Sequence, residues 1–193
     1  QKSLNRIDTF PGCIMTDPRE SSYQDHELEA SDLSGIGFAV ITLSDTRTHA
    51  DDKSGKLIQE LLQEAGHQTV FYELVPDDPE RIQVALEAAL ASKNVKVVVT
   101  NGGTGISARD SAIESIESYF DKRLDGFGEL FRSLSYEEIG AAAMVSRATA
   151  GTIGRRVVFC LPGSSNAVRL GMTKLILPQA AHLVQELWKD VEP

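Results

Sequence analysis

Apolar residues in this chain gather in short runs that are separated by segments of mixed polarity. Four runs are rich in valine, isoleucine and phenylalanine, and turn-forming residues follow each of them. Runs of this length and composition, bounded by such residues, are typical of buried β-strands. We therefore predict strands over residues 37–43, 68–75, 97–99 and 155–161.

The segments between these runs repeat apolar residues every three or four positions, which is the period of a helix with one buried face. Asp78 and Pro79 supply an N-cap and a first helical position, and Gly66 supplies a C-terminal stop. Pro178 interrupts the last periodic segment. The predicted helices cover residues 54–66, 79–90, 110–120, 165–177 and 180–190, and residues 126–151 are interpreted as one or two more.

Strands that alternate with helices predict an α/β domain with a mostly parallel central sheet. The domain is expected to cover residues 36–193. Residues 1–35 have no sustained apolar period and hold three basic against seven acidic side chains. We interpret them as an acidic N-terminal arm that is flexible; the alternative is an arm that packs on a neighbouring subunit.

The composition excludes several classes of protein. Of the 193 residues, 41% are hydrophobic and 24% are charged, which is typical of a soluble globular protein. The formal net charge of −9 argues against a nucleic-acid surface, and no apolar run approaches the roughly 18 residues of a membrane span. The isolated Cys13 and Cys160 give no zinc-site spacing. A cytoplasmic protein is expected.

Polar turns follow all four predicted strands. Open parallel sheets bind ligands beyond the carboxyl ends of their strands, so these turns are expected to meet in one crevice. Asp78 is interpreted only as the cap of the helix that follows it. The turns contain Ser44 and Asp45, Asp77 and Asp78, Gly102 to Gly105, and Gly163 and Ser164.

The loop after Val99 carries three glycines and ends on Arg109 and Asp110. It is not a Walker A loop, because no Gly-Lys-Ser/Thr follows, and it lacks the acid that a dinucleotide-binding loop needs about 20 residues later. A tight turn and a phosphate-binding loop both fit the glycines. Helix amides and Arg109 would attract phosphate, whereas Asp110 would repel it unless a cation bridged the two.

These segments together resemble a known family. TNGGTGISARD, with LVPDD before it and SYEEIGAAAMVSRATAG and LPGSSNAV after it, resembles the MoaB/Mog family of molybdenum cofactor biosynthesis proteins. ITLSDTRT and DKSG extend the resemblance to about residues 37–190. The segments GELFR, SYEEIG and LPGSSNAVRL are most similar to the MoaB branch.

The resemblance implies a three-layer α/β sandwich that binds molybdopterin. It also implies transfer of AMP from Mg-ATP to the molybdopterin phosphate, with release of pyrophosphate. Asp77 and Asp110 match the essential acidic positions of the family and would be the catalytic and Mg²⁺-binding residues. The phosphates would contact Gly102, Gly103, Thr104 and Gly105, and the pockets would be lined by Ser44, Asp45, Asp52, Gly163 and Ser164.

Two functions stay open at this point. A phosphate monoester is largely ionised near neutral pH, so adenylyl transfer needs positioning and charge compensation rather than a general base. The retained Arg109 and Asp110 favour an enzyme. Ala112 stands where many active relatives have threonine, which favours a non-catalytic molybdopterin-binding protein. Asp110 itself could either hold Mg²⁺ or cap the following helix.

The middle of the chain carries more apolar surface than one sheet face covers. With the resemblance, this predicts a homotrimer or a hexamer made of two trimers. The residues concerned are Phe127, Leu130, Phe131, Leu134, Ile139 and Met144.

Overall fold

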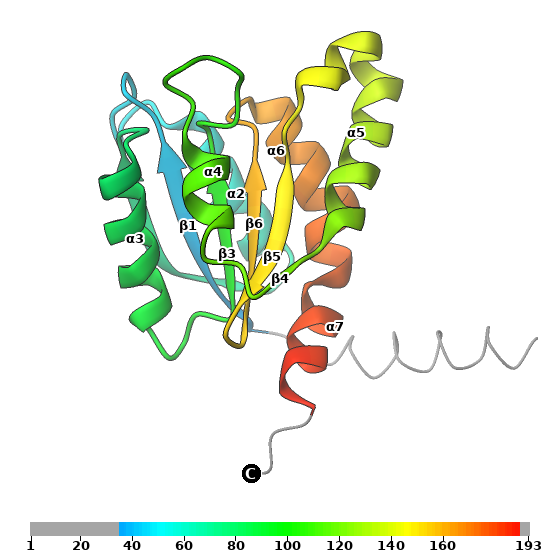
Figure 1. Ribbon diagram of the computed structural model, residues 1–193. Coiled ribbons are helices and arrows are strands. Elements are labelled where there is room, and N and C mark those ends of the chain that lie inside the picture. Colours follow the sequence, from blue (N-terminus) through cyan, green and yellow to red (C-terminus); the bar gives the residue numbers. More distant parts are fainter. Residues whose placement is uncertain (1–34, 190–193) are drawn as a thin grey trace, which may run out of the picture.

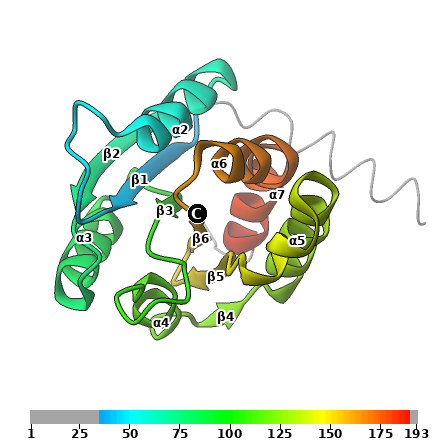
Figure 2. The same ribbon diagram turned by 90° about the horizontal axis from the view of Figure 1, so that it is seen from above.

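One six-stranded sheet lies between two layers of helices in the computed structural model, which describes residues 35–189 (Figures 1 and 2). This confirms the predicted α/β fold. Apart from Gly35, the predicted N-terminal arm lies outside the described residues. Within the described part of the chain, no helix is long and apolar enough to cross a membrane.

The sheet is parallel at its centre and antiparallel at one side. Its strand order is β2-β1-β3-β6-β5-β4; β1, β2, β3 and β6 are parallel, whereas β5 runs against β6 and β4. The strands are β1 (Gly37–Leu43), β2 (Gln68–Val75), β3 (Val97–Asn101), β4 (Lys122–Arg123), β5 (Thr149–Ile153) and β6 (Arg156–Leu161).

Helices cover both faces of this sheet (Figure 2). Buried residues of α2, α5, α6 and α7 pack on one face, and those of α3 and α4 pack on the other. The helical segments are α2 (Lys53–Glu64), α3 (Pro79–Ala91), α4 (Ala112–Glu117), α5 (Asp125–Ile139), the 3₁₀ helix η1 (Gly140–Val145), α6 (Ser165–Gly171), the π-helix η2 (Met172–Ile176) and α7 (Leu177–Trp188).

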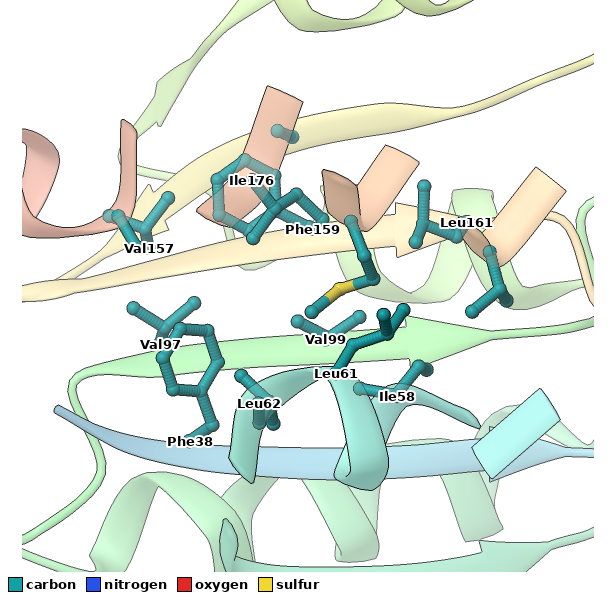
Figure 3. Packing of buried hydrophobic residues seen from close by; sticks show 14 of the residues in the cluster. Phe38, Ile58, Leu61, Leu62, Val97, Val99, Val157, Phe159, Leu161 and Ile176 are labelled. Atoms are coloured by element: carbon teal, nitrogen blue, oxygen red, sulfur yellow. The ribbon is translucent and has the colours of Figure 1, made fainter. Parts of the chain in front are cut away.

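Successive side chains of a strand point to opposite faces of the sheet, which explains why the domain has two hydrophobic cores. Phe38 and Val40 of β1 point into the core on the α2 side, whereas Ala39 and Ile41 point into the core on the α3 side. Figure 3 shows the first core, in which Phe38, Val97 and Val99 lie beside the α2 leucines. Because both faces are buried, the strands are almost continuously apolar, and this is why sequence patterning detects them.

The helical prediction for residues 126–151 is wrong at its end, where β5 begins at Thr149. The segment Thr-Ala-Gly-Thr-Ile has little of the bulky apolar pattern of a strand. Its small residues have a packing reason, since a Cβ on Gly151 would lie 2.3 Å from the Phe120 ring. The two-residue strand β4, which pairs with β5, was not predicted either.

The break predicted at Pro178 is also wrong, because the chain stays helical from α6 into α7. Immediately before α7 the helix widens into η2, where the Leu177 N–H donates to the Met172 carbonyl. Pro178 then lies in the first turn of α7. Proline has no N–H to donate, and both a π-turn and the first turn of a helix tolerate that loss. The helix therefore continues through Pro178 without a break.

Candidate functional site

The four polar turns meet at the carboxyl edge of the parallel strands, where the β3–α4 loop rises from the sheet (Figure 1). Asp45 accepts a hydrogen bond of 3.1 Å from the Asp77 N–H, which joins the β1 and β2 turns. The Gly102 N–H donates to the Leu161 carbonyl at 3.0 Å, which joins β3 to β6. The structure therefore brings the predicted site turns together.

The glycines of the β3–α4 loop are required by close packing. Gly102 and Gly103 have positive φ angles of 103° and 62°, a region that other residues rarely adopt. A Cβ on Gly102 would lie 2.1 Å from the Leu43 carbonyl oxygen, and one on Gly103 would lie 2.5 Å from the Asp77 carboxylate. A Cβ on Gly105 would lie 2.5 Å from Asp110. The loop backbone is thus in contact with both predicted metal-binding carboxylates.

Asp77 is half-buried and is held by α4. It accepts hydrogen bonds from the Ser111 N–H at 3.3 Å and from the Ser111 hydroxyl at 3.0 Å. Burial raises the pKa of Asp77, and repulsion by Asp110 and Asp45 raises it further, although the Ser111 hydrogen bonds oppose this shift. The three acids are therefore close enough to disfavour one another's charges, which a cation would relieve.

Asp110 does not cap α4, so the capping alternative is excluded. Ser111 occupies the N-cap position and makes no side-chain capping bond. The Asp110 carboxylate instead accepts a hydrogen bond of 2.8 Å from the Ser107 N–H within the loop. Hydrogen bonds from Ser107 lower the pKa of Asp110, and the charge of Arg147 contributes to the same shift. Asp110 is therefore ionised at neutral pH beside the glycines.

Two arginines approach the loop differently. Arg147 Nε donates to the Thr104 carbonyl at 3.0 Å, and its guanidinium pairs with Glu114, so that it ties the loop to α4. Thr104 itself is buried. Arg109 is exposed and has no hydrogen-bond partner among the described residues. Arg109 is thus a cation at the edge of the site with its donors available.

Asp52 lies beneath these turns and is fully buried. It accepts hydrogen bonds from Thr42 at 2.6 Å, from Tyr72 at 2.7 Å, and from the Gly55 N–H at 3.0 Å as the N-cap of α2. Burial would raise the pKa of Asp52, but these bonds and one from Ser54 hold it below its usual value. Asp52 supports the site from below, and direct contact with a ligand stays a prediction.

Arg47 connects this buried carboxylate to the fourth turn. Its guanidinium lies 3.6 Å from Asp52 and donates to Ser54 and, at 3.0 Å, to the Gly163 carbonyl. The backbone N–H of Arg47 in turn donates to the Ser44 hydroxyl at 3.2 Å. The Ser44 hydroxyl thus accepts a hydrogen bond within its own turn and stabilises that turn.

The β6–α6 turn packs against the glycine loop. A Cβ on Gly163 would lie 3.1 Å from the Gly102 Cα, so the two backbones are in contact. Ser164 is the exposed N-cap of α6 and accepts a hydrogen bond of 3.2 Å from the Ala167 N–H. The structure places all predicted site residues in or under one group of turns, and their contacts with ligands stay predictions.

Sequence reasoning missed three residues that hold these turns, namely Arg47, Ser111 and Arg147. Arg47 and Arg147 occur inside the family segments ITLSDTRT and SYEEIGAAAMVSRATAG, but nothing in one sequence shows that they reach Gly163 and Thr104. Ser111 follows Asp110 directly, and its bond to Asp77 depends on how the loop folds back. Such long-range contacts have no periodic signal.

The donors at the site fit a magnesium ion held together with phosphate. Mg²⁺ prefers carboxylate oxygens, keeps several waters and is usually bound through one or two carboxylates plus substrate phosphates. Asp77 and Asp110 supply two carboxylates beside the glycine loop. Among residues 35–189, no cluster of three or more acidic, histidine or cysteine side chains forms a complete cage. Asp77 and Asp110 are therefore the two side chains of this site that could hold a metal ion.

Comparison with known proteins gives the same family as the motifs. The family model described as a probable molybdopterin binding domain matches residues 39–182. Molybdenum cofactor biosynthesis protein B of Bacillus cereus is 58% identical over 152 residues, which cover 78% of this chain and 90% of that protein.

Solved structures agree with this match. A crystal structure of a molybdenum cofactor biosynthesis protein B is 54% identical, with a TM-score of 0.80 over 81% of this chain and 98% of the other. The tungsten cofactor synthesizing protein MoaB from Pyrococcus furiosus is 46% identical, with a TM-score of 0.72 over 79% and 96% of the two chains.

Asp52→Ala is expected to lower the free energy of unfolding by about 2–4 kcal/mol, because it removes an N-cap and leaves buried hydroxyl and N–H donors unpaired. Urea denaturation followed by circular dichroism measures this change. An exposed acid of α2 provides the control, since Glu60→Ala should leave the unfolding midpoint nearly unchanged. Equal midpoints for the two variants would show that the buried network contributes little.

Asp77→Asn is expected to stabilise the ligand-free protein slightly at neutral pH. The raised pKa means that ionising Asp77 costs stability, and this cost develops as the pH rises above about 4. Solvent screens the half-buried carboxylate, so the gain should be a fraction of a kcal/mol.

Unfolding free energies of wild type and Asp77→Asn, measured from pH 3.5 to 7, test this expectation. The two curves should converge at the acidic end and separate as the pH rises, with the variant more stable. A variant less stable than wild type at pH 7 would contradict the inferred repulsion.

Proposed function

The chain belongs to the family of probable molybdopterin binding domains, and from this premise we propose that it binds molybdopterin and transfers AMP from Mg-ATP to it. The proposed role lies in molybdenum cofactor biosynthesis, which the names of the Bacillus cereus and Bacillus subtilis relatives support. The observation that carries the proposed reaction is the pair Asp77 and Asp110 against the backbone of Gly103 and Gly105.

The proposed reaction is a displacement at phosphorus. An oxygen of the molybdopterin phosphate attacks the α-phosphorus of ATP, a new P–O–P link forms, and the bond to the β-phosphate breaks as pyrophosphate leaves. The attacking phosphate is largely ionised near neutral pH, its second pKa being about 6, so no side chain has to remove a proton. The protein must instead hold two anions in line and offset their repulsion.

The site supplies groups for both tasks. Backbone N–H groups of the loop around Gly103 to Gly105 can stabilise charge on the α-phosphate. Arg109, with its donors free, suits a second phosphate. Asp77 and Asp110 would hold Mg²⁺, which supplies charge neutralisation and alignment of the phosphate oxygens when it is bound. The repulsion between these acids supports a metal role, because a cation removes its cause.

A non-catalytic molybdopterin-binding protein of the same pathway is the alternative. Ala112 is fully buried in the core beneath the loop, and its N–H donates to the Gly103 carbonyl at 3.2 Å. As an alanine, it offers the site no hydroxyl. Pyrophosphate release from Mg-ATP in the presence of molybdopterin separates the two functions, because a binding protein releases none.

Asp110→Asn should lower the rate of pyrophosphate release by more than about a hundredfold, because a neutral amide compensates a metal ion poorly. Molybdopterin binding, measured by fluorescence titration, should persist. The matched control is Asp78→Asn, which alters an exposed carboxylate that only caps α3 through the Arg81 N–H and should keep normal turnover. Near-normal turnover of Asp110→Asn with an unchanged melting temperature would remove Asp110 from the mechanism.

We also propose that the protein assembles as a homotrimer or a hexamer through α5 and η1. Phe127 and Phe131 are buried in the core of their own chain, and the half-buried Leu134 packs against that core. The two phenylalanines therefore cannot serve the interface that the sequence predicted for them. The remaining apolar surface there is still large. Met144 is 82% exposed and Tyr136 is 64% exposed, and Leu130, Ile139 and Val145 are exposed beside them.

Light scattering should therefore give three or six times the chain mass of 21.0 kDa. The double substitution Tyr136→Glu and Met144→Glu should shift the protein toward the single-chain mass by placing charge in the interface. Val84→Glu, which alters a 61% exposed valine on α3, is the control and should not change the mass. Wild-type protein that scatters as one chain at micromolar concentration would contradict this assembly.

A further inference from the structure

A groove of about 520 Å³ opens at the edge of the sheet opposite the candidate site. It lies where β1 and β2 begin, and the loop between α3 and β3 forms one wall. This loop is very close to β1, since a Cβ on Gly37 would lie 2.1 Å from the Asn94 carbonyl oxygen. The lining includes Gly35, Val70, Lys93, Asn94, Lys96 and Val184, and we call it the lysine groove.

The lysine groove and its surroundings are positively charged. Lys93 and Lys96 line it, and the Lys96 Nζ lies 3.7 Å from the Trp188 ring centroid, with the Arg155 guanidinium 5.1 Å from the same centroid. Burial lowers the pKa of Lys96, and the charge of Arg156 lowers it further.

The cations of this cluster are Lys93, Lys96, Arg155 and Arg156. Within residues 35–189, none of them forms an ion pair with a carboxylate. Arg156 Nε is moreover buried without a hydrogen-bond partner in that part of the chain. The cluster therefore presents four cations for which the described residues show no ion pair, and an anionic group could pair with them.

The chain enters the lysine groove at Gly35, whose N–H donates to the Gly66 carbonyl at 3.0 Å. The 15 residues before it, 20–34, contain five acids and neither lysine nor arginine. Because a chain spans at most about 3.6 Å per residue, the Asp32 Cα must lie within about 11 Å of the Gly35 Cα. Because Gly35 lines the lysine groove, covalent connection limits how far the acidic segment can lie from it.

We infer that the lysine groove binds the chain's own acidic segment, residues 20–34. Carboxylates of this segment pair with Lys93 and Lys96. Leu33 and Leu28 supply apolar groups for the 38% exposed Val70 and for Val184. This interaction is independent of the proposed transfer of AMP. It differs from the flexible arm predicted from the sequence, which stays a prediction.

The tether makes such a contact effective even if it is weak. A short flexible link gives an effective concentration in the millimolar range, so an interaction with a Kd of about 1 mM between separate molecules is at least half occupied within one chain. Ion pairs near the surface are screened by salt. The contact should therefore weaken strongly at 1 M salt, where the Debye length is about 3 Å.

Zero-length carbodiimide coupling of the intact chain tests the proposal directly. Peptide mapping by mass spectrometry should find amide links from acids of residues 20–34 to Lys93 or Lys96, at least about threefold more often than to the exposed Lys122 on β4, because the tether enriches the docked pair. Mixing isotope-labelled and unlabelled protein should place these links within one chain. They should decline in 1 M NaCl.

Matched charge reversals complete the test. Lys93→Glu should reduce coupling to Lys96 by at least about threefold, because the repulsive charge expels the segment. Lys122→Glu should leave that coupling unchanged. The proposal is overturned if the acids couple equally to Lys93, Lys96 and Lys122, if the links join different chains, or if Lys93→Glu leaves coupling to Lys96 unaltered.

Discussion

The turns of the candidate site depend on one buried charge, the carboxylate of Asp52. It accepts hydrogen bonds from Thr42 of β1 and Tyr72 of β2 and caps α2. Through Ser54 and Arg47 its influence reaches Asn101 of β3 and the Gly163 turn after β6. A carboxylate without water must be fully hydrogen-bonded, so its partners have little freedom to move apart. The parallel strands bring the four turns to one edge, and this network fixes how they face one another.

The sequence was sufficient for the parallel half of the sheet, because strands buried on both faces are almost continuously apolar. The run at Val97 to Val99 and the glycines after it were found from local pattern alone, and so was the convergence of the turns. Motifs, rather than periodicity, supplied Asp77 and Asp110. The antiparallel side was missed because β5 is built from small residues that make room for Phe120. Its shape is set by a neighbour 31 positions away, which no short window of sequence contains.

The residues of the candidate site also fall into two groups, those that the sequence predicts and those that it does not. Glycines and acids that follow a strand directly are visible in the sequence, because topology alone decides where they lie. Arg47, Ser111 and Arg147 could not be found, since their importance arises from hydrogen bonds between loops that are distant along the chain. Pro178 illustrates the opposite error. A strong local rule predicted a helix break, whereas the widened turn of η2 accommodates the proline without one.

The pairing of β3 with β6 has a consequence for synthesis of the protein. Val97 lies opposite Val157, so the two central strands are separated by about 60 residues and their pairing closes a long loop. Such non-local pairing is slow compared with the formation of helices. The glycine loop is supported on one side by Leu161 and Gly163, and a nascent chain that ends before them lacks that wall. The group of turns around the glycine loop is therefore complete only after most of the domain has left the ribosome.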